Sequence, residues 1–176
     1  MAGESEEELD YSFKVAKVLG AIGIIAELND KNARLLGPVA KSNGMVVMFH
    51  NHAQYADPGI DVDKLLSYSS ANRLNFDVGH YFGSTGLHPA DFIRQYHDRI
   101  GSLHLKDKTR PDNVTQKDTN QVWGQGETPL DEVLRVVRDR KLPIYCDIEL
   151  EYPIAPWSTP VKEVKTCKEF CRQVLI

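Results

Sequence analysis

Five short apolar segments alternate with amphipathic segments along this chain, and this alternation limits the fold more than any other feature of the sequence. The apolar segments have the length and composition of strands, and they span residues 22–28, 45–49, 74–80, 100–105 and 144–150. Strands that alternate with helices form parallel sheets with right-handed crossovers. We therefore predict an α/β fold in which one helix is followed by five strand–helix units.

The length of the chain bounds how many such units it can hold. A closed barrel of eight strand–helix units typically needs about 250 residues, whereas this chain has 176. The sequence contains neither an internal repeat nor a low-complexity tract. Residues 1–176 are therefore predicted to form a single domain of fewer than eight units.

Capping residues mark where the predicted helices begin. Ser5 and Glu8 form a capping box, in which each side chain satisfies a backbone N–H of the first turn. Gly37-Pro38 is predicted to kink or split the second helix, because proline removes a hydrogen bond from a helix interior. The later helices are predicted to begin at a capping residue or beside a proline, at Asp30, Asp61, Pro89, Thr128-Pro129 and Thr159-Pro160.

Charge and cysteine content argue against several classes of partner. The formal net charge is −4, which argues against nucleic acid or an anionic membrane as a partner. We find no apolar run that could span a bilayer and no signal-peptide pattern, so the acidic residues 1–4 indicate a cytoplasmic protein if Met1 is the natural start. Cys146, Cys167 and Cys171 lack a metal-type spacing and are predicted to be free thiols.

Ionisable side chains stand at the end of every predicted strand. In parallel α/β folds, ligands bind beyond the carboxyl ends of the strands. Asp, Glu and His gathered from separate strands offer the mixed oxygen and nitrogen ligands that suit Mn²⁺, Mg²⁺, Co²⁺ or Zn²⁺. We therefore predict a metal or catalytic site, although each residue alone would also suit a capping or structural role. The strand ends carry Glu27, His50 and His52, Asp77 and His80, His104 and Lys106, and Glu149 and Glu151.

Asp77 lies in the most informative of these segments, which runs from Leu74 to His80. A buried carboxylate is costly unless it is paired, and a metal ion is a common partner. The alternative is an exposed strand end at which Asp77 acts as the N-cap of a helix. The four other strand ends of the same character favour the metal ligand.

Five stretches resemble the motifs of a known superfamily in their order and spacing. They are FHNH, LNFDVGH, SLHLKD, WGQGE and DIELEY, and together they resemble the xylose isomerase-like TIM-barrel superfamily. Within it they are most similar to the sugar phosphate isomerase/epimerase group. The resemblance covers essentially the whole chain. It implies that residues 1–176 are the C-terminal portion of such a barrel and supply strands four to eight of eight.

The resemblance also implies a metal site at the strand ends. One divalent ion is expected to be held by Asp77, His104 and Glu149, with His50 where the epimerases of the group have a Glu. Since those epimerases use two Glu residues as acid and base, His50 is expected here as a ligand or a base. Glu27 is an alternative source of the missing carboxylate.

Catalytic and substrate-binding roles follow from the same resemblance. Glu149 and His50 are the expected catalytic residues, and Glu151 takes the place of Glu149 if the strand register is shifted by two. The side chains expected to bind substrate are those of His52, His80, Lys106 and Trp123.

The reaction that the resemblance implies is metal-dependent isomerisation or epimerisation of a sugar or a sugar phosphate. A base would remove a proton next to a carbonyl, and the ion would stabilise the resulting enediolate. Expulsion of a hydroxyl after the same first step would instead make the protein a dehydratase or β-elimination lyase, acting on a keto-sugar or an inosose.

Two further alternatives remain open from the sequence. Asp118-Thr119-Asn120 resembles the Asp-x-His loop of endonuclease IV, but Asn120 replaces a His ligand and an acidic chain is poorly suited to DNA. Five strands alone would also leave two open sheet edges. The chain could therefore be an inactive barrel fragment, or it could pair with a second copy that completes the barrel.

Overall fold

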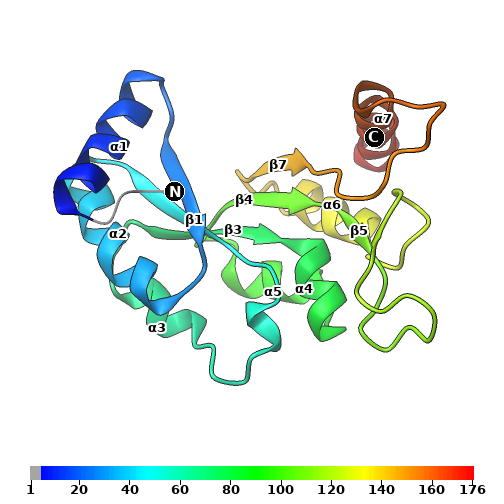
Figure 1. Ribbon diagram of the computed structural model, residues 1–176, viewed down its shortest axis with the longest axis horizontal. Coiled ribbons are helices and arrows are strands. Elements are labelled where there is room, and N and C mark those ends of the chain that lie inside the picture. The colour runs from blue at the N-terminus through cyan, green and yellow to red at the C-terminus, as the bar shows by residue number, and fades with distance from the viewer. Residues whose placement is uncertain (1–4) are drawn as a thin grey trace. The chain divides into compact units, whose positions relative to one another are not determined.

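The computed structural model describes residues 5–176 and contains a five-stranded sheet whose strands alternate with helices (Figure 1). Residues 1–4, on which the localisation prediction depends, lie outside the described residues. The sheet order is that of the chain, and the β1–β2, β2–β3 and β4–β7 pairs are parallel, which confirms the predicted α/β class. The strands are β1 (Gly23–Glu27), β2 (Val46–His50), β3 (Asn72–Asp77), β4 (Ile100–Leu105) and β7 (Tyr145–Ile148).

The helices begin at or close to the residues where the sequence predicts them. The capping box of Ser5 and Glu8 is present at the first helix, and Asp61 and Thr159 accept the expected backbone N–H at theirs. None of the helices in residues 5–176 is long and apolar enough to cross a membrane. The helices are α1 (Glu6–Val18), α2 (Asp30–Ser42), α3 (Val62–Ser67), α4 (Val78–Thr85), α5 (Pro89–Tyr96), α6 (Leu130–Asp139) and α7 (Pro160–Leu175), with a short 3₁₀ helix η1 (Gln54–Ala56) after β2.

Two predicted helix caps are wrong, and the predicted split of the second helix does not occur. The cap of α2 is Asn29 rather than Asp30, and α2 continues unbroken through Pro38. Proline removes one hydrogen bond, but the same turn buries Leu36 and Ala40, so packing offsets the loss. Thr128 does not cap α6, because its hydroxyl instead accepts the backbone N–H of Lys108 at 2.9 Å.

The third strand also ends earlier than predicted. It stops at Asp77, and α4 begins at Val78, so His80 lies in the first turn of a helix instead of on a strand. The predicted final strand is likewise shorter and ends at Ile148, before Glu149. The segment between β4 and α6 contains a small antiparallel pair, in which β5 (Asp107–Lys108) pairs with β6 (Asn120–Gln121).

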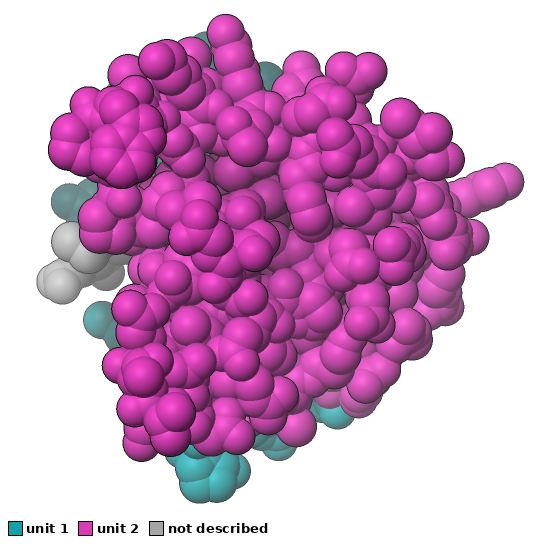
Figure 2. Space-filling view, turned by 90° about the vertical axis from the view of Figure 1, so that its right-hand side faces the viewer, with its two compact units in different colours: residues 1–76, 98–101 teal, residues 77–97, 102–176 magenta. Residues whose placement is uncertain are grey.

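The chain divides into two compact units. The first contains residues up to Phe76 together with Asp98–Gly101, and the second contains Asp77–His97 and Ser102–Ile176 (Figure 2). In the first unit the backbone N–H of Leu74 donates to the carbonyl of Arg99 at 2.8 Å, which joins β3 to the segment leading into β4. In the second, β4 and β7 lie side by side with Leu105 opposite Ile148 (Figure 1).

Each unit has its own buried side chains. In the first unit, α1 and α2 contribute Phe13 and Ala33, which are fully buried. In the second unit, α5 and α6 contribute Ile93 and Val133, which are also fully buried. Cys167 is buried on α7, and all three cysteines are free, as the sequence predicted.

Candidate metal and catalytic site

Lys106 is the centre of a cluster of ionisable side chains in the second unit. It follows β4 directly and is 1% exposed. Its Nζ lies 3.2 Å from Oδ2 of Asp77, 3.0 Å from Oε2 of Glu149 and 2.6 Å from Oε2 of Glu151. Burial alone would lower the pKa of this ammonium, yet the facing carboxylates raise it. Three carboxylates from two segments of the chain therefore surround one buried cation.

Asp77 combines the two roles that the sequence analysis treated as alternatives. Its Oδ1 accepts the backbone N–H of His80 at 2.7 Å, so Asp77 is the N-cap of α4. Its Oδ2 faces Lys106 and lies 4.0 Å from Nδ1 of His104. The side chain is fully buried, and burial raises the pKa of Asp77 to about 7. One oxygen holds the helix while the other points toward the cluster.

His104 and Glu149 form the adjoining pair. Nδ1 of His104 lies 2.8 Å from Oε2 of Glu149, and the backbone N–H of Glu149 donates to the carbonyl of Leu105 at 3.0 Å. The hydrogen bond to Glu149 raises the pKa of His104. Burial opposes ionisation of Glu149, but hydrogen bonds from His104 and Lys106 hold its pKa well below the usual range. Glu149 is therefore a carboxylate at neutral pH.

His80 links Lys106 to a second buried lysine. Its Nε2 lies 2.8 Å from Nζ of Lys106, and its Nδ1 lies 3.2 Å from Nζ of Lys108. Lys108 in turn pairs with Asp118 at 2.6 Å. The helix can come this close because residue 79 is a glycine, where a Cβ would lie only 2.6 Å from the carbonyl oxygen of Lys106.

Two side chains of this cluster have ligand atoms that could contribute to a site for a divalent ion. Asp77 and His104 belong to a group of His and Asp side chains whose ligand atoms could hold one, and Glu149 lies in hydrogen-bonding contact with His104. Carboxylate oxygens with one imidazole nitrogen suit Mn²⁺, Co²⁺ or Zn²⁺. His104 would bind an ion through a ring nitrogen that carries no proton. The carboxylates already gather around a cation, since Lys106 lies among them.

The first unit holds the two predicted site histidines that precede β3. His50 ends β2, and its Nδ1 lies 2.7 Å from Oδ1 of Asn75. Nδ1 of His52 lies 3.1 Å from Oε1 of Glu27, which also accepts a hydrogen bond from Gln54. The two imidazole rings meet edge to face with their centroids 4.7 Å apart. Each histidine therefore has an oxygen facing its Nδ1.

The structure thus brings together most of the predicted site residues within one or the other of the two units. Asp77, His80, His104, Lys106 and Glu149 meet in the second unit, together with Glu151. His50, His52 and Glu27 meet in the first. Trp123 lies in the loop before α6, where its ring meets that of Phe170 edge to face at 5.9 Å. Asn120, at the endonuclease-like position, donates to Glu151 at 3.2 Å.

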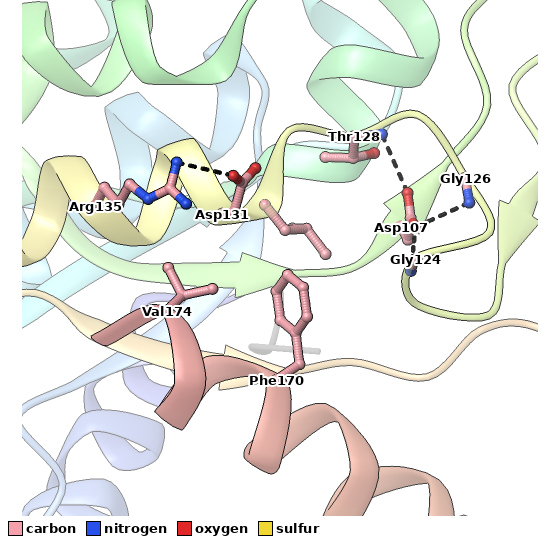
Figure 3. A pocket seen from close by; sticks show the side chains of 9 residues that line it. Asp107, Gly124, Gly126, Thr128, Asp131, Arg135, Phe170 and Val174 are labelled. Carbon is pink, nitrogen blue, oxygen red and sulfur yellow. Dashed lines mark hydrogen bonds and ion pairs between the residues drawn. The ribbon is translucent and has the colours of Figure 1, made fainter. Parts of the chain in front are cut away.

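Asp107 is a buried residue of this region that the sequence analysis did not single out. Its carboxylate accepts the backbone N–H groups of Gly124 at 2.8 Å, Gly126 at 3.0 Å and Thr128 at 3.1 Å (Figure 3). Burial raises its pKa although these bonds oppose the shift. The signal in the sequence is the pair of glycines in Trp123-Gly124-Gln125-Gly126, since a Cβ at Gly126 would overlap the Asp107 side chain.

Beside Asp107 is an open pocket of about 370 Å³. Phe170 and Val174 of α7 face it, and Asp131 and Arg135 of α6 form an ion pair at its edge (Figure 3). None of the predicted site residues lines this pocket. The ionisable side chains predicted for the site gather around Lys106 and not at this pocket.

Comparison with known proteins places the chain in one family. A family model described as xylose isomerase-like TIM barrel matches residues 27–172. An inosose dehydratase from Clostridium perfringens is 28% identical over 154 residues, which cover 76% of this chain and 51% of that protein. The chain therefore spans about half the length of the curated relatives it matches.

Solved structures share the same fold. A xylose isomerase domain protein from Planctomyces limnophilus superposes with a TM-score of 0.72 at 17% identity, covering 96% of this chain and 65% of that one. The IOLI protein with a bound zinc atom superposes with a TM-score of 0.68 at 16% identity, covering 96% and 68%. At these identities the likeness shows the fold alone.

Proposed function

Because the chain belongs to the xylose isomerase-like TIM barrel family, we propose that it carries the catalytic part of a metal-dependent dehydratase acting on a keto-sugar or an inosose. The observation that carries this proposal is the cluster in which Lys106 lies between Glu149 and Asp77, beside His104. It combines a set of metal ligands with an ionised carboxylate and a buried ammonium. Its relatives among the inosose dehydratases support the choice of reaction.

Asp77, His104 and Glu149 would hold the ion. When bound, a divalent ion polarises the carbonyl oxygen of the substrate and so acidifies the neighbouring C–H. His50 keeps its predicted role as a further ligand or a base. His52 and Trp123 keep theirs as substrate-binding residues. The assignments of these three residues rest on the resemblance and on the positions of the residues in the sequence.

The proton transfers fall to Glu149 and Lys106. The Glu149 carboxylate takes the proton from the carbon next to the carbonyl, and a carbon–carbon double bond forms as the hydroxyl on the next carbon departs. The Lys106 ammonium protonates that hydroxyl, which leaves as water. Glu149 is then a carboxylic acid and Lys106 an amine, and their 3.0 Å contact lets the proton return to Lys106. The net reaction is the loss of one water.

Isomerisation or epimerisation, the reaction first implied by the motifs, shares the first proton abstraction. The epimerases of the group use a Glu at the position of His50, so their acid–base pair is incomplete in this chain. Dehydration instead needs an acid for a departing hydroxyl, and the buried ammonium of Lys106 has a proton to donate. These two features favour the dehydratase.

The test is turnover of an inosose with Mn²⁺, Co²⁺ or Zn²⁺, followed by mass spectrometry of the product in deuterated water. We expect loss of one water in the wild type, and neither metal binding nor turnover in Asp77→Ala. A product of unchanged composition with deuterium at one carbon would instead establish the isomerase or epimerase. A protein that binds no ion by calorimetry and leaves the ketone unchanged would be an inactive fragment, and the proposal would fail.

A further inference from the structure

The pair of His50 and Asn75 lies on two neighbouring strands of the first unit. In the parallel register of β2 and β3, His50 stands opposite Asn75, and Nδ1 of His50 lies 2.7 Å from Oδ1 of Asn75. Asn75 is fully buried. Burying a carboxamide is costly unless it is hydrogen-bonded. The buried side chain of Asn75 therefore needs hydrogen-bond partners, and His50 is one of them.

The chemistry of the two groups defines the state of the ring. A carboxamide oxygen can only accept a hydrogen bond, so the Nδ1 of His50 must carry the proton that it donates. In a neutral imidazole only one nitrogen is protonated, and the other has a lone pair. The contact therefore selects the tautomer in which Nε2 has the lone pair. A metal ligand or a general base needs such a nitrogen.

We propose that Asn75 is a positioning residue that fixes His50 in the Nδ1–H tautomer, with Nε2 ready to hold an ion or to take a proton. Partners of this kind set the tautomer and ring orientation of metal-binding histidines. The consequence for metal binding rests on the proposed function of His50. The tautomer itself is a property of the two side chains and does not depend on that function.

The neighbouring histidine provides an internal contrast. His52 and Glu27 form a similar contact at 3.1 Å, but their side chains are 51% and 44% exposed. Water competes for an exposed contact, so Glu27 should control the tautomer of His52 weakly. Glu27→Gln keeps an oxygen at the same place and is a matched control that changes the first unit near His50 without touching Asn75.

The experiment is long-range nitrogen–proton NMR of the full chain with ¹⁵N-labelled histidine, without metal, with His50→Gln used to assign the His50 signals. The wild type should show a protonated Nδ1 and an unprotonated Nε2 at His50. Asn75→Leu removes the acceptor and should mix the two tautomers. Asn75→Asp restores an acceptor and should restore the Nδ1–H form, and Glu27→Gln should leave the His50 tautomer unchanged.

Zinc titration by calorimetry is the second readout. Loss of a partner that orients a ligand typically weakens metal binding by about 10- to 100-fold, so we expect this for Asn75→Leu and a smaller change for Asn75→Asp. A wild-type His50 protonated at Nε2, or an unchanged tautomer in Asn75→Leu, would overturn the inference. If the NMR result holds while His50→Gln binds zinc normally, the assignment of Asn75 stands and the proposed role of His50 fails.

Discussion

At the scale of single residues, Asp77 both caps a helix and contributes a carboxylate oxygen to the candidate site. Oδ1 caps α4 and Oδ2 faces Lys106. Asn is as good an N-cap as Asp, whereas Ala is not. Replacing Asp77 by each of them therefore separates the two roles.

We expect Asp77→Asn and Asp77→Ala to lose zinc binding alike, because neither offers a carboxylate. Asp77→Ala should also unfold at lower urea, with a free energy of unfolding about 1 kcal/mol below that of Asp77→Asn, since only Ala loses the cap. Urea titrations and calorimetry measure the two effects. Equal stability of the two variants would show that the bond to the His80 N–H contributes little.

A second prediction at this scale concerns Lys106. Its ammonium would compete with a metal ion for the carboxylates of Asp77 and Glu149. A unit charge a few ångströms from an ion costs several kcal/mol at an effective dielectric constant of about 20. We expect Lys106→Met to bind Zn²⁺ at least about tenfold more tightly than the wild type while losing turnover. Lys117→Met, which changes an exposed lysine in the following loop, is the matched control. Weaker zinc binding in Lys106→Met would argue that the lysine orders the site.

The gathering of Asp77, His104, Lys106 and Glu149 was predictable from the sequence, because the carboxyl ends of parallel strands meet at one edge of a sheet. Their roles stay predictions. Asp107 was missed for a physical reason. Its carboxylate bonds only backbone N–H groups, and sequence patterns do not show where backbone donors of a distant loop will lie. The central place of Lys106 was missed for the same reason, since it depends on three segments that are far apart in the sequence.

At the scale of elements, the junction of β3 and α4 explains the largest error in the predicted secondary structure. Leu74 to Val78 has the apolar character of a strand, and nothing in the composition marks its end. Asp77 ends it, because its side chain caps the next helix, and Gly79 then allows the first turn to pack against Lys106. His80 reaches Lys106 from a helix as a result.

The prediction at this scale concerns the loop from Trp123 to Thr128, whose backbone N–H groups donate to Asp107. Asn at position 107 would keep one acceptor oxygen but place an NH₂ group against backbone donors. We expect Asp107→Asn to cost about 1–3 kcal/mol of unfolding free energy, as for a buried donor left unsatisfied. The loop should loosen, so in a Trp157→Phe background acrylamide should quench Trp123 fluorescence more strongly. These are the two tryptophans of the chain, and Trp157 is 83% exposed.

The control for this experiment lies between β5 and β6. Asp112 is exposed and pairs with Arg110 at the surface, so Asp112→Asn should leave both stability and quenching near the wild-type values. Quenching that is the same in Asp107→Asn as in Asp112→Asn would contradict a role of Asp107 in holding the loop.

At the scale of the whole molecule, the order of the sheet was predictable because alternating strands and helices leave few topologies. The division into two units was not, because it depends on contacts between segments distant in sequence. The segment Asp98–Gly101 belongs to the first unit although the residues on both sides of it belong to the second. Strand exposure follows the sheet order, since Ile25 on β1 and Tyr145 on β7 are both more than half exposed at its two edges.

The pH dependence of stability is a property of the whole molecule that the site controls. The pKa values of Asp77 and His104 are raised in the folded state, to about 7 for Asp77. A group of this kind stabilises the fold fully below its unfolded pKa, and the contribution is lost as the pH rises through the folded pKa. The lowered pKa of Glu149 acts only at acid pH. We therefore expect the free energy of unfolding, measured by urea titration in a chelator, to fall between about pH 5 and pH 8. The double variant Asp77→Asn/His104→Gln should flatten this fall, whereas a rise over the same interval would contradict the assignment.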